Sequence, residues 1–177
     1  RGRMSARESY AEPWEVGEPL RGGVVAEVVE SNSDELAAGD VVTGELQWAE
    51  YGVATPEELR QIDPEQAPIS TALGVLGMTG ITAYFGTREI AEPEDGETFV
   101  VTGAAGAVGS VAGQIAKIDG ARVVGFAGSD EKVEFLEDEL GFDVGINYKA
   151  TDDYEAALAE AAPDGVDVYF DNVGGPI

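Results

Sequence analysis

The hydrophobic positions in the middle of the chain change their spacing at one point. Residues 98–102 are consecutive strand formers that end at Gly103, and a short apolar run bounded by a turn residue predicts a buried strand. From Val108 the apolar positions recur at helical spacing, which predicts an amphipathic helix; its other members are Val111, Ala112, Ile115 and Ile118. The pattern therefore predicts a strand, a glycine-rich turn and a helix in direct succession.

The same alternation of strand and helix continues through the rest of the chain. Apolar runs predict three more strands, at 121–126, 143–146 and 166–170, with a helix before each of the last two. Ser129 and Thr151 are placed to cap these two helices through their short polar side chains. The order β-α-β-α-β-α-β is typical of an α/β fold with a parallel sheet.

The first part of the chain shows short apolar runs separated by Gly and Asp turns. These runs predict strands at 22–30, 38–44 and 48–54, as in a small β-barrel. Residues 56–68 are polar and read as turns. Residues 70–87 are apolar almost throughout but contain three glycines, which predicts a helix, a break and a second helix between two domains.

These patterns divide the chain into two domains. Residues 1–78 are expected to be part of a β-barrel domain, and residues 79–177 a partial nucleotide-binding domain with a parallel sheet. The chain begins at Arg1 without an initiator methionine, so we expect it to be a piece of a longer protein.

The glycine-rich turn after residue 102 is the first candidate site. Gly103, Gly106 and Gly109 follow the spacing G-x-x-G-x-x-G, which differs from the commoner G-x-G-x-x-G. Bare backbone at the N-terminus of a helix offers free N–H groups and a positive dipole end to an anion. The turn therefore predicts a dinucleotide diphosphate site, although an ordinary strand–helix turn has the same composition.

The residues around the predicted strand ends favour NADP(H) over NAD(H). NAD sites usually carry an acid at the end of the second strand that bonds the ribose 2′-hydroxyl, whereas residues 126–129 contain none. Lys132, one helical turn further, could pair with a 2′-phosphate or be a solvated helix charge. Tyr148 could contact the adenosine end or be a strand-edge aromatic. Asn172 follows the fourth strand, where ligands bind, but also suits a plain turn.

The charge of the chain restricts its partners. It has 35 acidic and 10 basic residues, a net charge of −25, with 44% hydrophobic residues, so the composition is that of a folded protein with an acidic surface. Such a surface suits concentrated salt, which screens self-repulsion, and we expect a halophilic protein. Nucleic acid is a poor partner for it.

The missing residue types exclude several kinds of chemistry within this chain. It contains no Cys and no His, which rules out disulfides, thiol or imidazole metal ligands, and catalysis by either side chain. No apolar run reaches membrane-spanning length and no signal peptide is recognisable. We therefore expect a cytoplasmic protein that holds no metal and contacts no membrane.

Five motifs together resemble one enzyme family over nearly the whole chain. They are similar to the zinc-free branch of the medium-chain dehydrogenases/reductases that includes prostaglandin reductases and plant 2-alkenal reductases, and they lie at residues 1–4, 77–84, 103–110, 145–149 and 167–175. The resemblance implies a Rossmann-type sheet preceded by part of a GroES-like barrel. It also implies NADPH-dependent reduction of the C=C bond of α,β-unsaturated ketones and aldehydes, by hydride transfer to the β-carbon.

The resemblance also implies roles for single residues. The diphosphate would contact Gly106, Ala107, Val108 and Gly109. Lys132 and Tyr148 would hold the 2′-phosphate end, and Thr82 and Asn172 would lie beside the nicotinamide. Tyr10 would be the catalytic contact to the substrate, in a pocket bordered by Glu45, Leu46 and Trp48. Thr79 replaces the proline that the family usually has there, a change expected to be mild.

Two other functions fit the same residues. Related enzymes reduce quinones, so the small-molecule substrate could be an enone or a quinone. A nucleotide-binding module without catalysis is the other alternative, since part of the family's active site lies outside this chain. The resemblance further implies a homodimer.

Overall fold

The computed structural model describes Met4 and residues 13–175. The chain divides into two compact units, Arg1–Leu73 and Gly74–Ile177, and each is described by itself. Tyr10, the predicted catalytic residue, lies outside the described residues. No helix in the described part of the chain is long and apolar enough to span a membrane.

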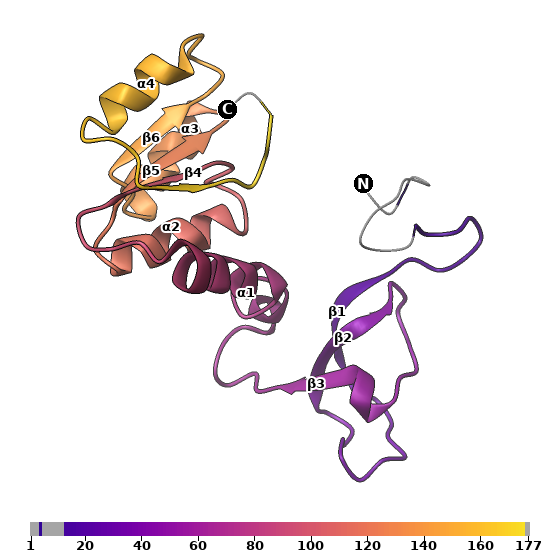
Figure 1. The fold of residues 1–177 in the computed structure, drawn as a ribbon. Helices are drawn as coiled ribbons and strands as arrows, with labels where there is room; N and C mark the ends of the chain where they lie inside the picture. Colours follow the sequence, from indigo (N-terminus) through magenta and orange to yellow (C-terminus); the bar gives the residue numbers. More distant parts are fainter. Residues whose placement is uncertain (1–3, 5–12, 176–177) are drawn as a thin grey trace. The chain divides into compact units, whose positions relative to one another are not determined.

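The first unit contains a three-stranded antiparallel sheet in the order β1-β2-β3 (Figure 1). The strands β1 and β2 pair in register from Arg21↔Gln47 to Glu27↔Val41, and β3 joins the other edge of β2. Two short 3₁₀ helices, η2 and η3, flank β3. The bounds are β1 Arg21–Glu27, β2 Val41–Gln47, η2 Pro56–Glu58, β3 Leu59–Ile62 and η3 Ile69–Leu73.

The predicted position of the third strand was wrong. Residues 48–54 form an irregular segment, and nearly all of it is exposed. The third strand is β3, in the stretch 56–68 that was predicted to be turns. Its two ends, Leu59 and Ile62, are half-buried while the residues between them are exposed. This short edge strand therefore lacks the alternation of apolar and polar residues that predicts a strand.

The second unit contains a parallel four-stranded sheet in the order β6-β5-β4-β7. The first strand of this unit, β4, therefore lies between its second strand, β5, and its fourth, β7, which is the order of a Rossmann-type half-sheet. This confirms the predicted fold class. The strands are β4 Thr98–Val101, β5 Arg122–Ala127, β6 Val144–Asn147 and β7 Val168–Phe170.

Helices cover both faces of this sheet (Figure 1). Right-handed crossovers require this, because the chain steps in one direction from β4 to β6 and then reverses to reach β7. The helices α2 and α3 pack with Phe99 and Val101 on one face, and α4 packs with Val100 on the other. The helical segments are α1 Met78–Phe85, η4 Gly86–Ala91, α2 Gly109–Ile118, α3 Asp130–Glu134, η5 Phe135–Glu139 and α4 Tyr154–Ala161.

One of the two predicted helix caps is correct. Ser129 accepts a hydrogen bond from the Lys132 N–H at the start of α3. At α4 the cap is Asp153, whose carboxylate accepts from the Ala156 N–H at 2.9 Å. Thr151 instead bonds the backbone of Asp153, because a carboxylate two residues further on is closer to the free amides of the helix.

Asp143 ties three elements of the second unit together. Its carboxylate accepts from the Val123 N–H at 2.7 Å and pairs with the Lys117 ammonium at 2.9 Å, which joins the start of β6 to β5 and α2. Burial raises the pKa of Asp143, but the bonds from Val123 and Lys117 outweigh burial and hold the pKa below its usual value. Its charged form therefore stabilises the folded state.

We expect Asp143→Asn to lower the free energy of unfolding by about 1 kcal/mol at pH 7, since it weakens a charge-assisted network. The deficit is expected to shrink as the pH falls below the pKa of Asp in the unfolded chain, about 3.9, and further below the lower pKa of Asp143 in the folded protein, because the carboxyl then loses its charge. Urea unfolding from pH 7 to pH 3 measures it. Asp152→Asn is the control, because exposed Asp152 makes no bond or ion pair among the described residues; equal deficits in both variants would contradict the role of Asp143.

Candidate functional site

The turn between β4 and α2 presents a row of unpaired backbone amides. The Gly106 N–H donates to the Gly103 carbonyl at 2.8 Å, and the Ser110 N–H donates to the Gly106 carbonyl at 3.0 Å. Within residues 13–175, the N–H groups of the three residues between them, 107–109, donate no hydrogen bond. Free amides at the N-terminus of a ten-residue helix form an anion site.

The glycines of this turn allow its backbone segments to pack closely against one another. Gly103 has a φ of 56°, which favours glycine. A Cβ at Gly109 would lie 2.5 Å from the Gly103 oxygen and 2.9 Å from the Ala104 Cα. A Cβ at Gly106 would lie 2.9 Å from the same oxygen. The space left by these missing side chains is thus filled by the turn itself, and the place for a diphosphate is at the amides rather than in that space.

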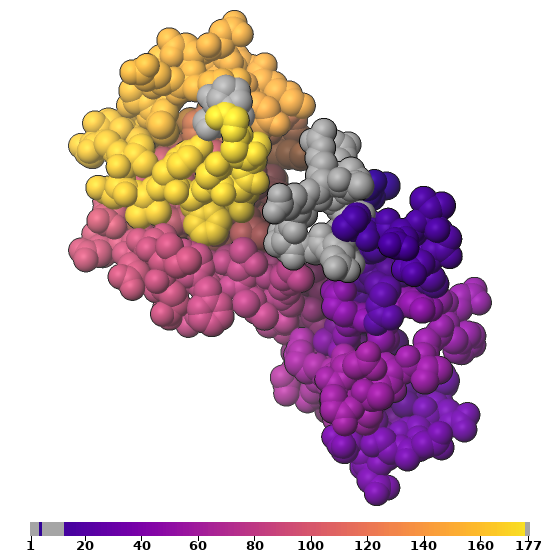
Figure 2. Space-filling view, turned by 45° about the vertical axis from the view of Figure 1, so that its right-hand side comes forward, coloured from indigo at the N-terminus to yellow at the C-terminus, as the bar shows by residue number. Residues whose placement is uncertain are grey.

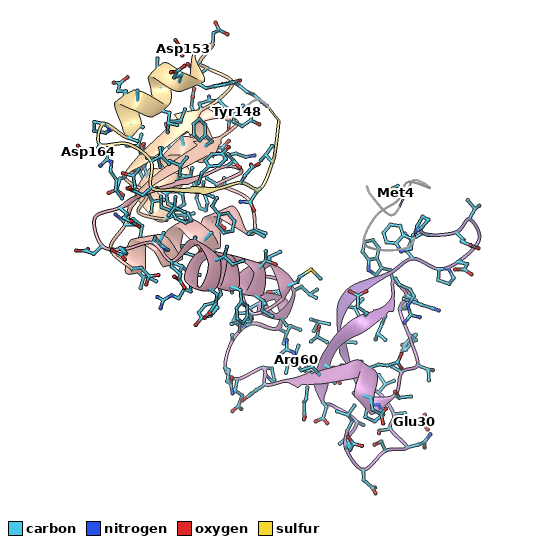
Figure 3. The ribbon with its side chains drawn as sticks, in the orientation of Figure 1. Met4, Glu30, Arg60, Tyr148, Asp153 and Asp164 are labelled. Atoms are coloured by element: carbon cyan, nitrogen blue, oxygen red, sulfur yellow. The ribbon has the colours of Figure 1, made fainter. Side chains whose placement is uncertain are left out.

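Tyr148 closes the turn that follows β5. Its backbone N–H donates to the Ala127 carbonyl at 3.0 Å, and its hydroxyl oxygen lies 2.7 Å from the position of a Cβ at Gly128. The Lys149 ammonium lies 6.0 Å from the centre of the Tyr148 ring. Tyr148 is labelled in Figure 3, at the end of the parallel sheet where β6 ends. A residue with a side chain at position 128 would displace it.

Lys132 lies in the helix that begins after this turn. The residue is exposed, and within the described part of the chain its ammonium forms no ion pair. That ammonium is therefore available to an anion near the end of β5. The arrangement is compatible both with a 2′-phosphate site and with a solvated lysine.

Thr102 and Asp171 join the carboxyl ends of β4 and β7. The buried Thr102 hydroxyl donates to the Asp171 carboxylate at 2.6 Å and accepts from the Asn172 N–H at 2.9 Å. The Asn172 side-chain amide donates to the Thr102 carbonyl at 3.0 Å. Hydrogen bonds from Thr102 and from the amides of Val173 and Gly174 hold the pKa of Asp171 below its usual value.

This network places Asn172 beside the glycine turn. The Asn172 Cβ lies 3.5 Å from the Cβ position at Gly103. The strands β4 and β7 are neighbours at the point where the strand order reverses, and ligands of open α/β sheets bind at such points. Residues 171–175 are exposed and belong to the yellow segment at the surface of the second unit in Figure 2.

Thr82 is on α1 of the same unit. Its hydroxyl donates to the Met78 carbonyl at 2.8 Å, and the residue is exposed. The helix α1 packs against α2, and among the described residues no hydrogen bond joins Thr82 to Asn172. The structure therefore brings Gly103, Gly106–Gly109 and Asn172 together, and it groups Tyr148 with the turn after β5.

The predicted substrate residues lie on β2 and just beyond it. Glu45 and Trp48 are exposed, whereas Leu46 is half-buried, since neighbouring side chains point to opposite faces of a strand. Leu46 lines a cavity of about 1000 Å³ in the first unit, while Glu45 and Trp48 are not among its lining residues. Trp48 instead packs over Gly22, with its ring nitrogen 3.0 Å from the Cβ position there. This cavity is therefore not bordered by all three residues, and their role at a substrate pocket stays a prediction.

Two groups of site residues were missed by the sequence reasoning. The first is the Thr102–Asp171 pair, and the second is the bond between Asn147 and Asp130 at the ends of β6 and α3. The available signal was a polar residue at the end of an apolar strand, as at Asn147, or directly after it, as at Thr102.

The fold and the amide site define a dinucleotide-binding α/β domain that follows a β domain. Comparison with known proteins agrees with this class. Residues 1–62 match the family described as the N-terminal domain of oxidoreductase, and residues 107–177 match the family described as zinc-binding dehydrogenase.

The most similar relatives include YfmJ of Bacillus subtilis, 60% identical over the whole chain and 52% of the relative. A 2-alkenal reductase (NADP(+)-dependent) of Nicotiana tabacum is 47% identical over 99% of the chain and 52% of its own length. The crystal structure of CurA in complex with NADPH from Vibrio vulnificus superposes with a TM-score of 0.92 at 44% identity, covering 98% of the chain and 51% of CurA.

The matched domains and the relatives are those of the medium-chain dehydrogenases/reductases, and the relatives include 2-alkenal reductase and prostaglandin reductase 1. The resemblance inferred from its motifs is thereby confirmed. The chain spans about half the length of the curated relatives that it matches.

We expect Gly109→Ala to weaken dinucleotide binding and to lower the free energy of unfolding by about 1–3 kcal/mol, because the new methyl group would overpack the turn. Alanine forms helices better than glycine, so helix propensity alone would make Gly109→Ala more stable. A loss of stability would therefore come from the close contact at the turn. Urea unfolding and a fluorescence titration with NADPH measure the two effects. Gly52→Ala is the control, since its Cβ would meet nothing within 4 Å; a stabilised Gly109→Ala with unchanged binding would show that the turn tolerates a side chain.

Proposed function

We propose that this chain is part of an NADPH-dependent reductase that acts on the C=C bond of α,β-unsaturated ketones and aldehydes. The observation that carries the proposal is the amide row of residues 107–109 at the switch point of a Rossmann-type sheet. The family membership supports the reaction, since one relative is named a 2-alkenal reductase and a similar structure holds NADPH.

The proposed cofactor site uses the residues around the carboxyl end of the sheet. Gly106, Ala107, Val108 and Gly109 contact the diphosphate. The N–H groups of the last three have no acceptor among the described residues and have the helix dipole behind them. Lys132 and Tyr148 hold the 2′-phosphate end. Asn172 and Thr82 orient the nicotinamide end. The described residues fit this group on three grounds. The amides of residues 107–109 have no acceptor there, the Lys132 ammonium has no ion pair there, and positions 126–129 contain no carboxylate.

The proposed reaction requires the protein to position the substrate and to stabilise charge. Bound NADPH would supply the hydride that the β-carbon of the enone accepts. Negative charge then develops on the carbonyl oxygen, which a hydrogen-bond donor must stabilise, and we propose Tyr10 for this contact. Glu45, Leu46 and Trp48 border the substrate pocket. Most of the rate enhancement comes from alignment at near-attack distance.

We propose that this chemistry uses no zinc. The family matched by residues 107–177 is described as zinc-binding, but these 177 residues contain neither Cys nor His, which are the usual zinc ligands besides carboxylates. The carbonyl must then be polarised by hydrogen bonds alone. We further propose a cytoplasmic protein that works as a homodimer in concentrated salt and is about twice as long as this chain.

The cofactor preference tests the proposed site. In the whole protein we expect tight binding of NADPH, and Lys132→Ala to raise its Kd about 10-fold, the equivalent of one hydrogen bond between charged groups. Binding of NADH, which lacks the 2′-phosphate, should not change. Arg60→Ala is the control, because it removes an exposed cation from the first unit. Equal losses for both cofactors in Lys132→Ala would contradict the assignment.

Turnover separates the proposed substrate class from its alternatives. The whole protein with NADPH is expected to reduce an enone faster than a quinone. Faster reduction of the quinone would favour a quinone reductase. Tight NADPH binding without turnover of either substrate would favour a binding module.

The net charge of −25 makes the salt dependence of binding unusual. NADPH is a polyanion, so long-range repulsion opposes its approach, and salt screens long-range interactions before close pairs. We expect the affinity for NADPH to rise with KCl at first and to fall when the pairing with Lys132 is screened. Titrations at several KCl concentrations measure this; an affinity that only falls with added salt would contradict it.

A further inference from the structure

An acidic side chain lies near the place where a carboxylate would favour NADH. Asp130 is the third residue after the end of β5 and comes 21 residues after Gly109. In Rossmann-type sites for NAD, an acid near the end of the second strand accepts a bond from the ribose 2′-hydroxyl. The same charge would repel a 2′-phosphate. A protein that selects NADPH must therefore keep this carboxylate from acting at the ribose.

The Asp130 carboxylate is held by a neighbouring strand. The Asn147 side-chain amide donates to Asp130 Oδ1 at 2.6 Å. Asn147 is the last residue of β6 and pairs with Ala127, the last residue of β5, so the register of the sheet places its amide beside the turn that leads to Asp130.

The orientation of the Asn147 amide is set from its other end. Its Oδ1 accepts from the Lys149 backbone N–H at 3.1 Å, so its nitrogen is the atom that faces Asp130. Rotating the amide would place two oxygens together and lose both bonds. The residue is half-buried at the strand end, which restricts its side chain further.

The Asp130 carboxylate is bonded to Asn147 and not to a neighbouring cation. Lys132 follows two residues later in the chain, yet Asp130 forms no ion pair in the described part of the protein. The other nearby cation, Lys149, lies over the Tyr148 ring. The acid Glu131 is exposed beside Asp130 and makes no side-chain bond among the described residues. At the proposed adenosine end of the cofactor, Oδ1 of the Asp130 carboxylate thus accepts a hydrogen bond from a neutral amide. The ammonium of Lys132 stays available to an anion.

We propose that Asn147 is a positioning residue that selects NADPH over NADH by holding the Asp130 carboxylate away from the ribose. The inference rests on the proposed function. With Asn147 in place, Oδ1 of the carboxylate is bonded to the amide, and this bond holds the carboxylate away from both a 2′-hydroxyl and a 2′-phosphate. Without Asn147, the carboxylate turns toward the ribose, where it repels NADPH and accepts a bond from NADH.

The test is a double-mutant cycle of Asn147→Ala and Asp130→Asn in the whole protein. Titrations give the Kd of NADPH and of NADH for each variant. We expect Asn147→Ala to lower the preference for NADPH about 3- to 5-fold, the size typical of an exposed charged pair. In the Asp130→Asn background, Asn147→Ala should leave the preference unchanged, because no carboxylate remains to be held. KM for NADPH should rise in Asn147→Ala while kcat changes little.

A purely structural role for Asn147 predicts a different result. It would weaken both cofactors equally and would do so with or without Asp130; either finding overturns the inference. Glu131→Gln is the matched control, since it removes a neighbouring charge that Asn147 does not hold, and Asn147→Ala in that background should still lower the preference. A wild-type protein that binds NADH as tightly as NADPH overturns the proposed function itself, whereas a preference for NADPH that is the same in Asn147→Ala as in the wild type overturns only the role of Asn147.

Discussion

The close packing of α2 against the end of β4 is the constraint on which the rest of the second unit depends. At Gly109 the helix touches the Gly103 and Ala104 backbone so closely that a single methyl group would not fit. This contact brings the start of α2, with its unpaired amides, to the carboxyl edge of the sheet. The bond between Thr102 and Asp171 then attaches β7 to the same edge. The proposed anion site is thus a consequence of how the strand–turn–helix unit closes.

Electrostatics set the second constraint. A protein with a net charge of −25 can attract a polyanion only through local donors, because its long-range field is repulsive. The second unit supplies such donors as backbone amides, which carry no net charge, and as Lys132, which forms no ion pair in the described part of the chain. Two acidic side chains near the site are hydrogen-bonded within the protein, Asp130 to Asn147 and Asp171 to Thr102. Hydrogen bonding of these acids is therefore as important to the proposed site as the donors themselves.

The sequence predicted most of the second unit and less of the first. The central strands β4 and β5 are almost completely buried and the helices are amphipathic, so the apolar pattern located the elements to within a few residues. The edge strand β3 has only two half-buried residues, too few to show a period. The cap at Asp153 and the bonds of Thr102 and Asn147 join residues whose pairing depends on side-chain direction or on the order of the strands. A single sequence does not display that order, although the motifs correctly indicated the family. The roles of Tyr10, Thr82 and the β2 residues stay predictions.

In the proposed site the backbone amides of residues 107–109 receive the cofactor diphosphate. Amide chemical shifts in a ¹⁵N-labelled sample, followed while NADPH is added, test this contact. We expect the amides of Ala107, Val108 and Gly109 to shift strongly and together as the site fills, because each gains an anionic acceptor. Saturable binding of NADPH that leaves these three amides unmoved would contradict it.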